Sequence, residues 1–271
     1  MVRQKQTTVN QPSRSDQEFV GGRRNVAYNP GSKTRRLSGS AEAIRATIPV
    51  DQLQSSQGEQ RKTILDALKK NREKIQEHHE KSHGNEKKTI ALDIDGVMAN
   101  FNAAMRGYGT DLAKQEESPM DYNYMKAGWF KNFEDFNDAH LSVMKRPQDI
   151  PLNDPTSGQA VDLLKKNGYN VVAVTARREE WRDGTLEFFK KNNIDIQDKE
   201  LIFSDRDAKA DTVDYDYILD DAPKNIIETL QKSDAEPVVY TQRYNEHVDG
   251  LKRVGSVLEF AQYIIDRDKN R

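Results

Sequence analysis

The feature that most constrains the fold is an alternation of short apolar runs and helical patterns along residues 88–271. Five runs rich in Val, Ile and Leu are predicted strands, at 89–92, 170–174, 201–203, 217–219 and 237–240. Helical patterns occupy 157–167, 184–192, 223–231 and 257–266, and Ser256 is the expected N-cap of the last one. Strands that are apolar throughout and alternate with helices are typical of a parallel sheet covered on both faces. We therefore predict an α/β fold, with a Rossmann-like parallel sheet and helices on both of its faces.

The composition of the chain narrows the classes of function. In its 271 residues, 42 Lys and Arg are balanced by 44 Asp and Glu, which argues against a protein that is basic throughout and coats nucleic acid. There is no Cys, so disulfides, thiolate metal sites and cysteine nucleophiles are excluded. No apolar run approaches the roughly 20 residues that cross a bilayer, and the first residues lack an apolar signal core. We expect a cytoplasmic protein that has no membrane partner.

The first 87 residues differ in composition from the rest. Residues 1–60 are rich in Gln, Ser, Arg, Gly and Asn and hold few large apolar side chains, so we predict a long, basic, disordered N-terminal arm. The first 45 residues contain nine Lys and Arg and three acidic residues. This excess of positive charge suits contact with nucleic acid or an acidic partner, although a solvated tail explains the same charges. Residues 61–87 are expected to form an exposed helix and linker, because Ile64, Leu65, Leu68 and Ile75 make only a sparse apolar stripe.

Polar residues follow four of the predicted strands. In chain order these are Asp93 and Asp95, Thr175 and Ala176, Lys209, and Asp220 and Asp221. Because the carboxyl ends of parallel strands meet at one edge of a sheet, where ligands bind, we expect these residues to converge. Paired carboxylates at the end of a buried strand are unfavourable unless a positive group binds there. Each feature alone also fits an ordinary turn, strand or surface ion pair, and their combination predicts a site that binds a cation and an anion.

In this order, the four sets of residues resemble the four motifs of the haloacid dehalogenase (HAD) superfamily of phosphotransferases. Residues 91–101, which read ALDIDGVMANF, are more closely similar to the 5′(3′)-deoxyribonucleotidase branch and its phage and bacterial relatives. Val97 stands where many other members of the superfamily have Thr. The resemblance covers residues 89–271 and none of the first 87. It implies a HAD-like phosphatase domain at 88–271, with a small helical cap at about 101–155 inserted after the first strand.

The resemblance also implies a Mg²⁺-dependent phosphomonoesterase, a 5′-nucleotidase acting on deoxyribonucleotides, that works through an aspartyl-phosphate. Asp93 is the expected nucleophile, and Asp95 is the expected general acid and base. Mg²⁺ is expected to bind among Asp93, Asp95 (through its backbone carbonyl), Asp220 and Asp221. Asp221 is the preferred distal ligand, but the sequence does not decide whether Asp220 or Asp221 binds the ion. The phosphoryl oxygens are expected to be bound by Thr175, the Ala176 amide and Lys209.

The substrate is expected to be a small phosphate monoester, a nucleotide whose base stacks on aromatic residues of the cap. Candidate contacts are Phe101, Trp129, Phe130, Arg177 and Arg178. Most aromatic residues of the inserted segment are expected to form the core of the cap itself, and one or two of them to line the pocket.

Two other functions fit the sequence. The enzyme could be a 3′-phosphatase for nucleic-acid ends, with the basic arm following a phosphate backbone. Alternatively, a non-catalytic HAD-like domain could be tethered to an assembly by the arm, although the presence of all four motifs argues against this. The chain has no GxxxxGK[ST] loop, so a fused kinase activity is not predicted.

Overall fold

The computed structural model describes residues 56–81, 87–204 and 208–270. Most of the predicted arm, residues 1–55, lies outside the described residues, so its predicted disorder stays a prediction. Within the described ranges, no helix is both long enough and apolar enough to cross a membrane.

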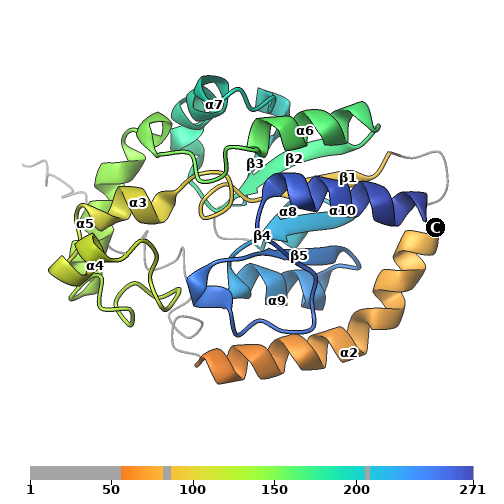
Figure 1. The fold of residues 1–271 in the computed structure, drawn as a ribbon, viewed down its shortest axis with the longest axis horizontal. Helices are drawn as coiled ribbons and strands as arrows, with labels where there is room; N and C mark the ends of the chain where they lie inside the picture. Colours follow the sequence, from red (N-terminus) through yellow and green to blue (C-terminus); the bar gives the residue numbers. More distant parts are fainter. Residues whose placement is uncertain (1–55, 82–86, 205–207, 271) are drawn as a thin grey trace, which may run out of the picture. The chain divides into compact units, whose positions relative to one another are not determined.

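Six parallel strands form one sheet in the order β3-β2-β1-β4-β5-β6 (Figure 1). They are β1 (Thr89–Leu92), β2 (Asn170–Thr175), β3 (Leu201–Phe203), β4 (Tyr217–Asp220), β5 (Glu236–Tyr240) and β6 (Arg253–Val254). The five predicted strands are confirmed to within one residue at each end, whereas β6 is too short to leave a pattern in the sequence. The chain order reverses at β1, which pairs with β2 on one side and β4 on the other. Ligands of such sheets bind beyond the carboxyl ends of the strands at this reversal.

Helices cover both faces of the sheet, which explains why its strands are apolar throughout. Along β1, Ile90 and Leu92 belong to the hydrophobic cluster under α6 and α10, while Ala91 belongs to a second cluster on the opposite face. Figure 1 shows α6 and α10 on one side of the sheet and α9 on the other. The predicted helices are confirmed, and the Ser256 hydroxyl caps α10 by accepting a hydrogen bond from the amide of Glu259. The core helices are α6 (Ser157–Lys166), α7 (Arg182–Lys191), α8 (Lys209–Thr212), α9 (Pro223–Lys232) and α10 (Val257–Lys269). Short 3-10 helices lie at Pro147–Asp149, Glu179–Trp181, Asp198–Glu200 and Arg243–Asn245.

A small cap is inserted between β1 and α6, as the sequence predicts. It contains α3 (Phe101–Arg106), α4 (Asp111–Gln115) and α5 (Phe133–Met144), which Figure 1 shows beyond one end of the sheet. Asn100, Thr110 and Asn132 cap these helices by accepting hydrogen bonds from backbone amides of the first turn. Buried aromatic rings, including those of Trp129, Phe130 and Phe136, form the interior of the cap.

The prediction of an exposed helix at 61–87 is wrong about its exposure. The structure has α2 at Gln57–Lys81, and α2 lies along α9 (Figure 1). Ile64 is fully buried and, with Ala67 and Ile75, packs in one cluster with Ile226 and Leu230 of α9. The buried stripe also includes Asn71, whose amide donates to the carbonyl of Leu230. Ala and Asn contribute little to an apolar pattern. Because Ala67 and Asn71 belong to the buried stripe, the sequence alone predicts a sparser stripe than the structure has.

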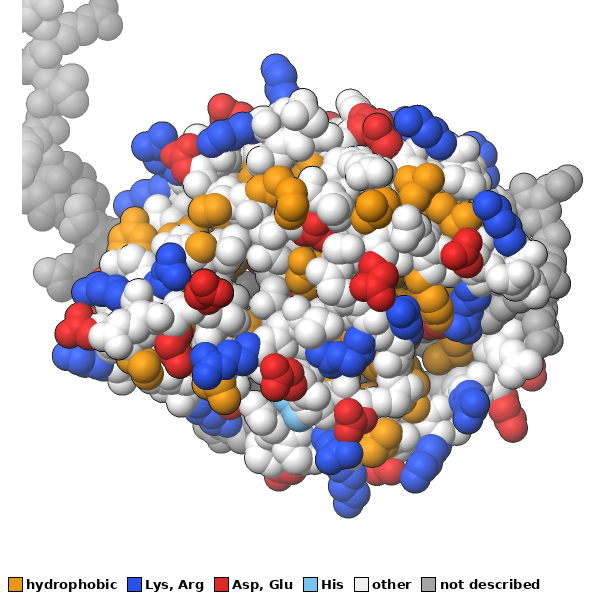
Figure 2. Space-filling model, in the orientation of Figure 1, with side chains coloured by type: hydrophobic (Ala, Val, Ile, Leu, Met, Phe, Trp, Pro, Cys, Tyr) orange, Lys and Arg blue, Asp and Glu red, His pale blue; other side chains and the backbone are white. Residues whose placement is uncertain are grey.

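The face of the molecule that is drawn in Figure 2 has a mixed surface charge. Figure 2 shows Lys and Arg side chains interspersed with Asp and Glu across this face. Among its described residues there is no extended patch of one charge, so this face does not resemble a surface that binds along a nucleic-acid backbone.

Candidate active site

The chain turns sharply after β1, and the turn carries two of the predicted site residues, Asp93 and Asp95. The amide of Asp93 donates to the carbonyl of Leu219 in β4 at 3.0 Å. Gly96 has a φ of +90°, and a Cβ at this position would lie 2.1 Å from Oδ2 of Asp221. Glycine alone tolerates both this backbone conformation and this close approach. The turn is therefore held tightly against the end of β4.

Three buried carboxylates meet at the ends of β1 and β4. Oxygens of Asp93, Asp220 and Asp221 lie within 4.8 Å of one another. Lys209, which is also buried, places its Nζ 2.6 Å from Oδ1 of Asp93 and 2.7 Å from Oδ2 of Asp220. Burial raises the pKa of Asp93 to about 7, although Lys209 acts to lower it. Burial opposes the charge of Lys209, but Asp220 and Asp93 raise its pKa above the ordinary value. One lysine thus faces three acids, an arrangement that a bound cation would stabilise.

Asp220 and Asp221 have different environments. The oxygens of Asp220 accept hydrogen bonds from Lys209, from the Ala222 amide at 2.9 Å and from the Asn225 amide group at 3.0 Å. Asp221 accepts one hydrogen bond at Oδ2, from the hydroxyl of Tyr244, and its buried Oδ1 has no partner among the described residues. Burial, with the charges of Asp93 and Asp220, raises the pKa of Asp221 well above the ordinary value. The free oxygen makes Asp221 the better ligand for a hard divalent cation.

Asp95 is paired with Arg177, whose guanidinium is buried. Two hydrogen bonds join them, from Arg177 Nε to Oδ2 at 2.8 Å and from Arg177 Nη2 to Oδ1 at 2.7 Å. Arg177 also donates to the hydroxyl of Thr185 at 3.0 Å. The sequence suggested Arg177 as a substrate contact, but its guanidinium is engaged by Asp95 and Thr185. A two-hydrogen-bond pair of this kind fixes the orientation of the carboxylate.

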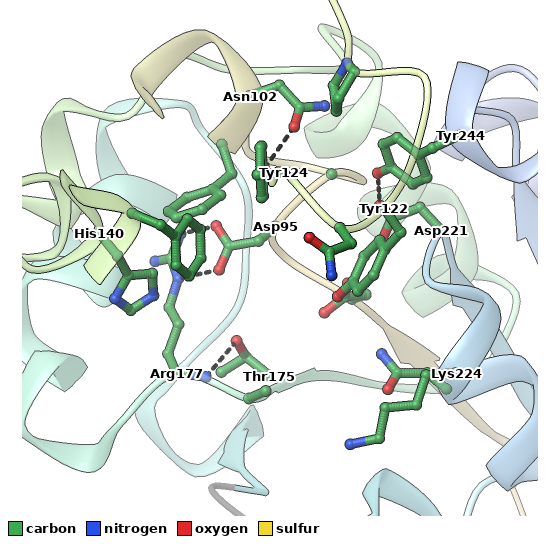
Figure 3. Close-up of a pocket in the computed structure, with 18 of the residues that line it drawn as sticks. Asp95, Asn102, Tyr122, Tyr124, His140, Thr175, Arg177, Asp221, Lys224 and Tyr244 are labelled. Carbon is green, nitrogen blue, oxygen red and sulfur yellow. Dashed lines mark hydrogen bonds and ion pairs between the residues drawn. The ribbon is translucent and has the colours of Figure 1, made fainter. Parts of the chain in front are cut away.

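Thr175 and Ala176, at the end of β2, line the same cavity as Asp93 and Lys209. The Thr175 hydroxyl is buried and accepts a hydrogen bond from the amide of Arg177 at 3.2 Å (Figure 3). A hydroxyl and neighbouring backbone amides at a strand end suit the binding of an anion. The structure therefore brings together the residues that the sequence predicted from the ends of separate strands.

The cap supplies the other walls of this cavity. Its contribution includes Phe101, Asn102, Tyr122, Tyr124, Phe136 and His140. Of the predicted substrate contacts, Phe101, Arg177 and Arg178 line the cavity. Trp129 and Phe130 do not, because they are buried inside the cap, where the Trp129 indole donates to Glu116 at 2.9 Å. A cap this small needs large rings for its own core.

The segment after β5 supplies site residues that the sequence analysis missed. Gln242 donates to the carbonyl of Gly96 at 2.7 Å. Tyr244 donates to Asp221, and its ring lies 5.6 Å from that of Tyr122 in the cap. Burial and the charge of Asp221 raise the pKa of Tyr244 well above the ordinary value. These residues follow a fifth predicted strand at the same edge of the sheet, so the reasoning used for the other four strand ends would have identified them.

No family model matches the chain, and no curated protein was found to be similar to it. Solved structures found to be similar to the chain include a dehalogenase, at 10% identity and a TM-score of 0.44, with 66% of this chain and 97% of that chain covered. A hydrolase from Pseudomonas syringae has 13% identity and a TM-score of 0.45, with 67% and 99% covered. A HAD family hydrolase from Deinococcus radiodurans, solved with bound phosphate and sodium, has 9% identity and a TM-score of 0.45, with 68% and 96% covered. At these levels of similarity the activity of those proteins does not transfer to this chain.

Proposed function

We propose that the chain is a Mg²⁺-dependent phosphomonoesterase of the HAD type that hydrolyses nucleoside monophosphates through an aspartyl-phosphate. The observation that carries the proposal is the convergence of Asp93, Thr175, Lys209 and Asp221 on one cavity beyond the carboxyl ends of the strands. Transfer of a phosphoryl group to a carboxylate needs a nucleophile, a fixed positive charge, a metal ligand and donors for the phosphoryl oxygens. These four residues can supply those functions.

The acidic residues fit a hard divalent cation such as Mg²⁺. The unpartnered Oδ1 of Asp221, close to the carboxylate of Asp93, supports this fit. We assign Asp93, Asp221 and the backbone carbonyl of Asp95 as the ligands, and when bound the ion would neutralise part of the charge on the phosphate. Asp220 is assigned to holding Lys209, because its oxygens are already engaged by protein donors.

In the first step, an oxygen of Asp93 forms a bond to phosphorus while the bond between phosphorus and the leaving oxygen breaks. Asp95 donates a proton to the leaving oxygen. In the second step, Asp95 accepts a proton from the water that attacks the aspartyl-phosphate, which releases inorganic phosphate and restores Asp93. The phosphoryl oxygens are held by Lys209, the Thr175 hydroxyl and the Ala176 amide. Arg177 is assigned to positioning Asp95 and not to binding substrate.

Nucleotides are the proposed substrates because aromatic side chains from the cap and the core line the same cavity. Arg178 also lines it, and its guanidinium lies 5.4 Å from the centre of the Trp181 ring. A second candidate, a 3′-phosphatase for nucleic-acid ends, is favoured by the basic composition of the first 45 residues. The two proposals share one chemistry and differ in the leaving group.

A substrate panel tests both proposals. Deoxyribonucleotides, ribonucleotides, sugar phosphates and 3′-phosphorylated oligonucleotides would be compared with and without Mg²⁺. The full chain would be compared with a chain that begins at Ser56, which keeps α2. Equal, Mg²⁺-dependent hydrolysis of free nucleotides by both chains is the expected result. A preference for oligonucleotides that is lost with residues 1–55 and with rising salt would instead favour the 3′-phosphatase. Absence of phosphatase activity on every substrate would contradict both.

A further inference from the structure

His140 is a polar residue of the cavity that the proposed reaction does not use. It lies on α5 and lines the cavity. Among the described residues, neither of its ring nitrogens has a hydrogen-bond partner, and Nδ1 is buried. A shielded polar atom without a partner destabilises the folded protein, and such atoms commonly mark a position where water or a ligand binds.

Three aromatic rings surround His140. The ring centres of Phe101 and Trp181 each lie 5.6 Å from that of His140, and the ring of Phe136 lies at 6.0 Å. These residues come from the cap and from the segment after β2, and all of them line the cavity. Planar ligands bind favourably among such rings, because aromatic faces and edges attract one another.

The imidazole of His140 is neutral near pH 7. Burial lowers its pKa to about 4, and the charges of Arg178 and Arg177 also lower it, although Asp95 acts in the opposite direction. A neutral imidazole offers one donor and one acceptor nitrogen. It therefore suits the uncharged polar edge of a ligand and not a phosphate group.

His140 lies on the side of the cavity where a leaving group would be. Figure 3 shows His140 beside Asp95 and Arg177, whereas Asp221 and Lys224 lie across the cavity. If Asp95 protonates the leaving oxygen, as proposed above, the rest of the leaving group extends past Asp95 toward the cap. The metal and the phosphate would lie on the opposite side, near Asp221.

We infer that His140 is a specificity-determining residue that hydrogen-bonds the polar edge of a planar heteroaromatic ring, the base of a nucleoside leaving group. The inference rests on the proposed function and identifies the residue that distinguishes nucleotides from other phosphate esters. A sugar or alkyl leaving group has no planar polar edge to place among Phe101, Phe136 and Trp181. A base satisfies both the rings and the unpartnered imidazole.

The test compares His140→Phe, which keeps an aromatic ring but removes both nitrogens, with His140→Gln, which restores a donor and an acceptor. Glu134→Gln, an exposed change on the same helix, is the matched control. Each variant would be assayed on deoxyribonucleoside monophosphates and on 2-deoxyribose 5-phosphate, which has the same sugar but no base. Binding of nucleosides without phosphate would be followed through the fluorescence of Trp181. Trp181 is one of two tryptophans, and the other, Trp129, is buried in the cap.

His140→Phe is expected to lower kcat/KM for nucleoside monophosphates, and nucleoside affinity, by about tenfold, which corresponds to one lost hydrogen bond. The loss on 2-deoxyribose 5-phosphate should be less than about twofold. His140→Gln should recover part of the loss, and Glu134→Gln should match the wild type. Equal losses on both esters, or no loss on nucleotides, would overturn the inference. If the wild type hydrolyses no phosphate ester, the proposed function fails, and nucleoside binding alone decides the role of His140. Weaker binding by His140→Phe would then support the inference, and unchanged or absent binding would overturn it.

Discussion

The carboxylates of Asp93 and Asp221 are buried, and burial disfavours their ionised form. Both have raised pKa values, and a single lysine, Lys209, lies among three acids. Such an arrangement lowers the stability of the metal-free fold, and cavities that hold perturbed acids are frequently functional sites. At the scale of residues, the proposed chemistry can be tested with substitutions that affect the proposed nucleophile and the proposed proton donor one at a time.

Replacing Asp93 with Asn should lower kcat by at least about 10³-fold, because an amide cannot form the aspartyl-phosphate. The phosphoenzyme trapped by acid quenching after reaction with a labelled substrate should disappear in parallel. Circular dichroism would confirm that the variant is folded. Near-normal turnover, with phosphoenzyme still present, would exclude Asp93 as the nucleophile.

Replacing Arg177 with Gln should impair the reaction most for poor leaving groups, because Arg177 holds the carboxylate of Asp95, the proposed proton donor. We expect kcat to fall by about 10- to 100-fold on an alkyl phosphate and by less than about threefold on 2,4-dinitrophenyl phosphate. The 2,4-dinitrophenolate leaving group of the second ester departs without protonation. Asp95→Asn should show the same dependence on the leaving group.

Arg182→Gln is the control for this prediction. Arg182 lies in the same segment but pairs at the surface with Glu179 and Asp198, and it does not line the cavity. An equal loss on both esters in Arg177→Gln would indicate a structural role or direct phosphate binding in place of positioning.

At the scale of elements, the site is built by the segments that follow the strands. Residues that follow β1, β2, β4 and β5 line the cavity. The segment after β5 contacts both Asp221 and the cap residue Tyr122 through Tyr244. Arg243 adds a second link to the cap, with its guanidinium 3.2 Å from an oxygen of Glu116. Cap and sheet are therefore joined directly at the site.

The helix α2 is a structural part of the domain, so its buried face should contribute to stability. Ile64→Ala is expected to lower the free energy of unfolding by about 3 kcal/mol and the melting temperature by about 6–10 °C. Lys69→Ala, an exposed change on the same helix, should have little effect. Turnover at 20 °C, below unfolding, should stay within about twofold of the wild type, since α2 does not line the cavity. Equal melting temperatures for the two variants would contradict the packing of α2 on α9.

At the scale of the whole molecule, the acidic cluster couples stability to pH. The pKa of Asp93 is raised from an ordinary value of 3.8 to about 7, so the folded protein holds a proton that the unfolded chain has lost between these values. The stabilisation from this proton is full below pH 4 and is lost as the pH rises through 7. Asp93→Asn removes this dependence.

In EDTA, the melting temperature of Asp93→Asn relative to the wild type should therefore increase between pH 4 and pH 8, by roughly 10 °C. Saturating Mg²⁺ should raise the melting temperature of the wild type at pH 8 more than that of the variant, because the proposed ion would bind the ionised cluster. Differential scanning calorimetry would measure both quantities. A difference that does not change with pH would show that Asp93 does not titrate in this range.

Local patterns were sufficient for much of the fold. Apolar strands need neighbours on both faces, so their positions, the parallel sheet and the helices between them could be predicted from periodicity. The convergence of the polar residues that follow the strands could be predicted from the same pattern, because the carboxyl ends of parallel strands lie at one edge of the sheet. The prediction failed at α2, where Ala67 and Asn71 complete a buried stripe that the other residues do not reveal.

Which side chains meet depends on distances between segments remote in the chain, and local patterns do not contain that information. The pairing of Arg177 with Asp95, the contact of Tyr244 with Asp221 and the enclosure of His140 all join such segments. The same holds for Trp129 and Phe130, whose rings could have faced a ligand or the cap interior. Residue type and spacing established which chemistry is available at the sheet edge. Long-range packing selected the atoms that are engaged, buried or left free for a ligand.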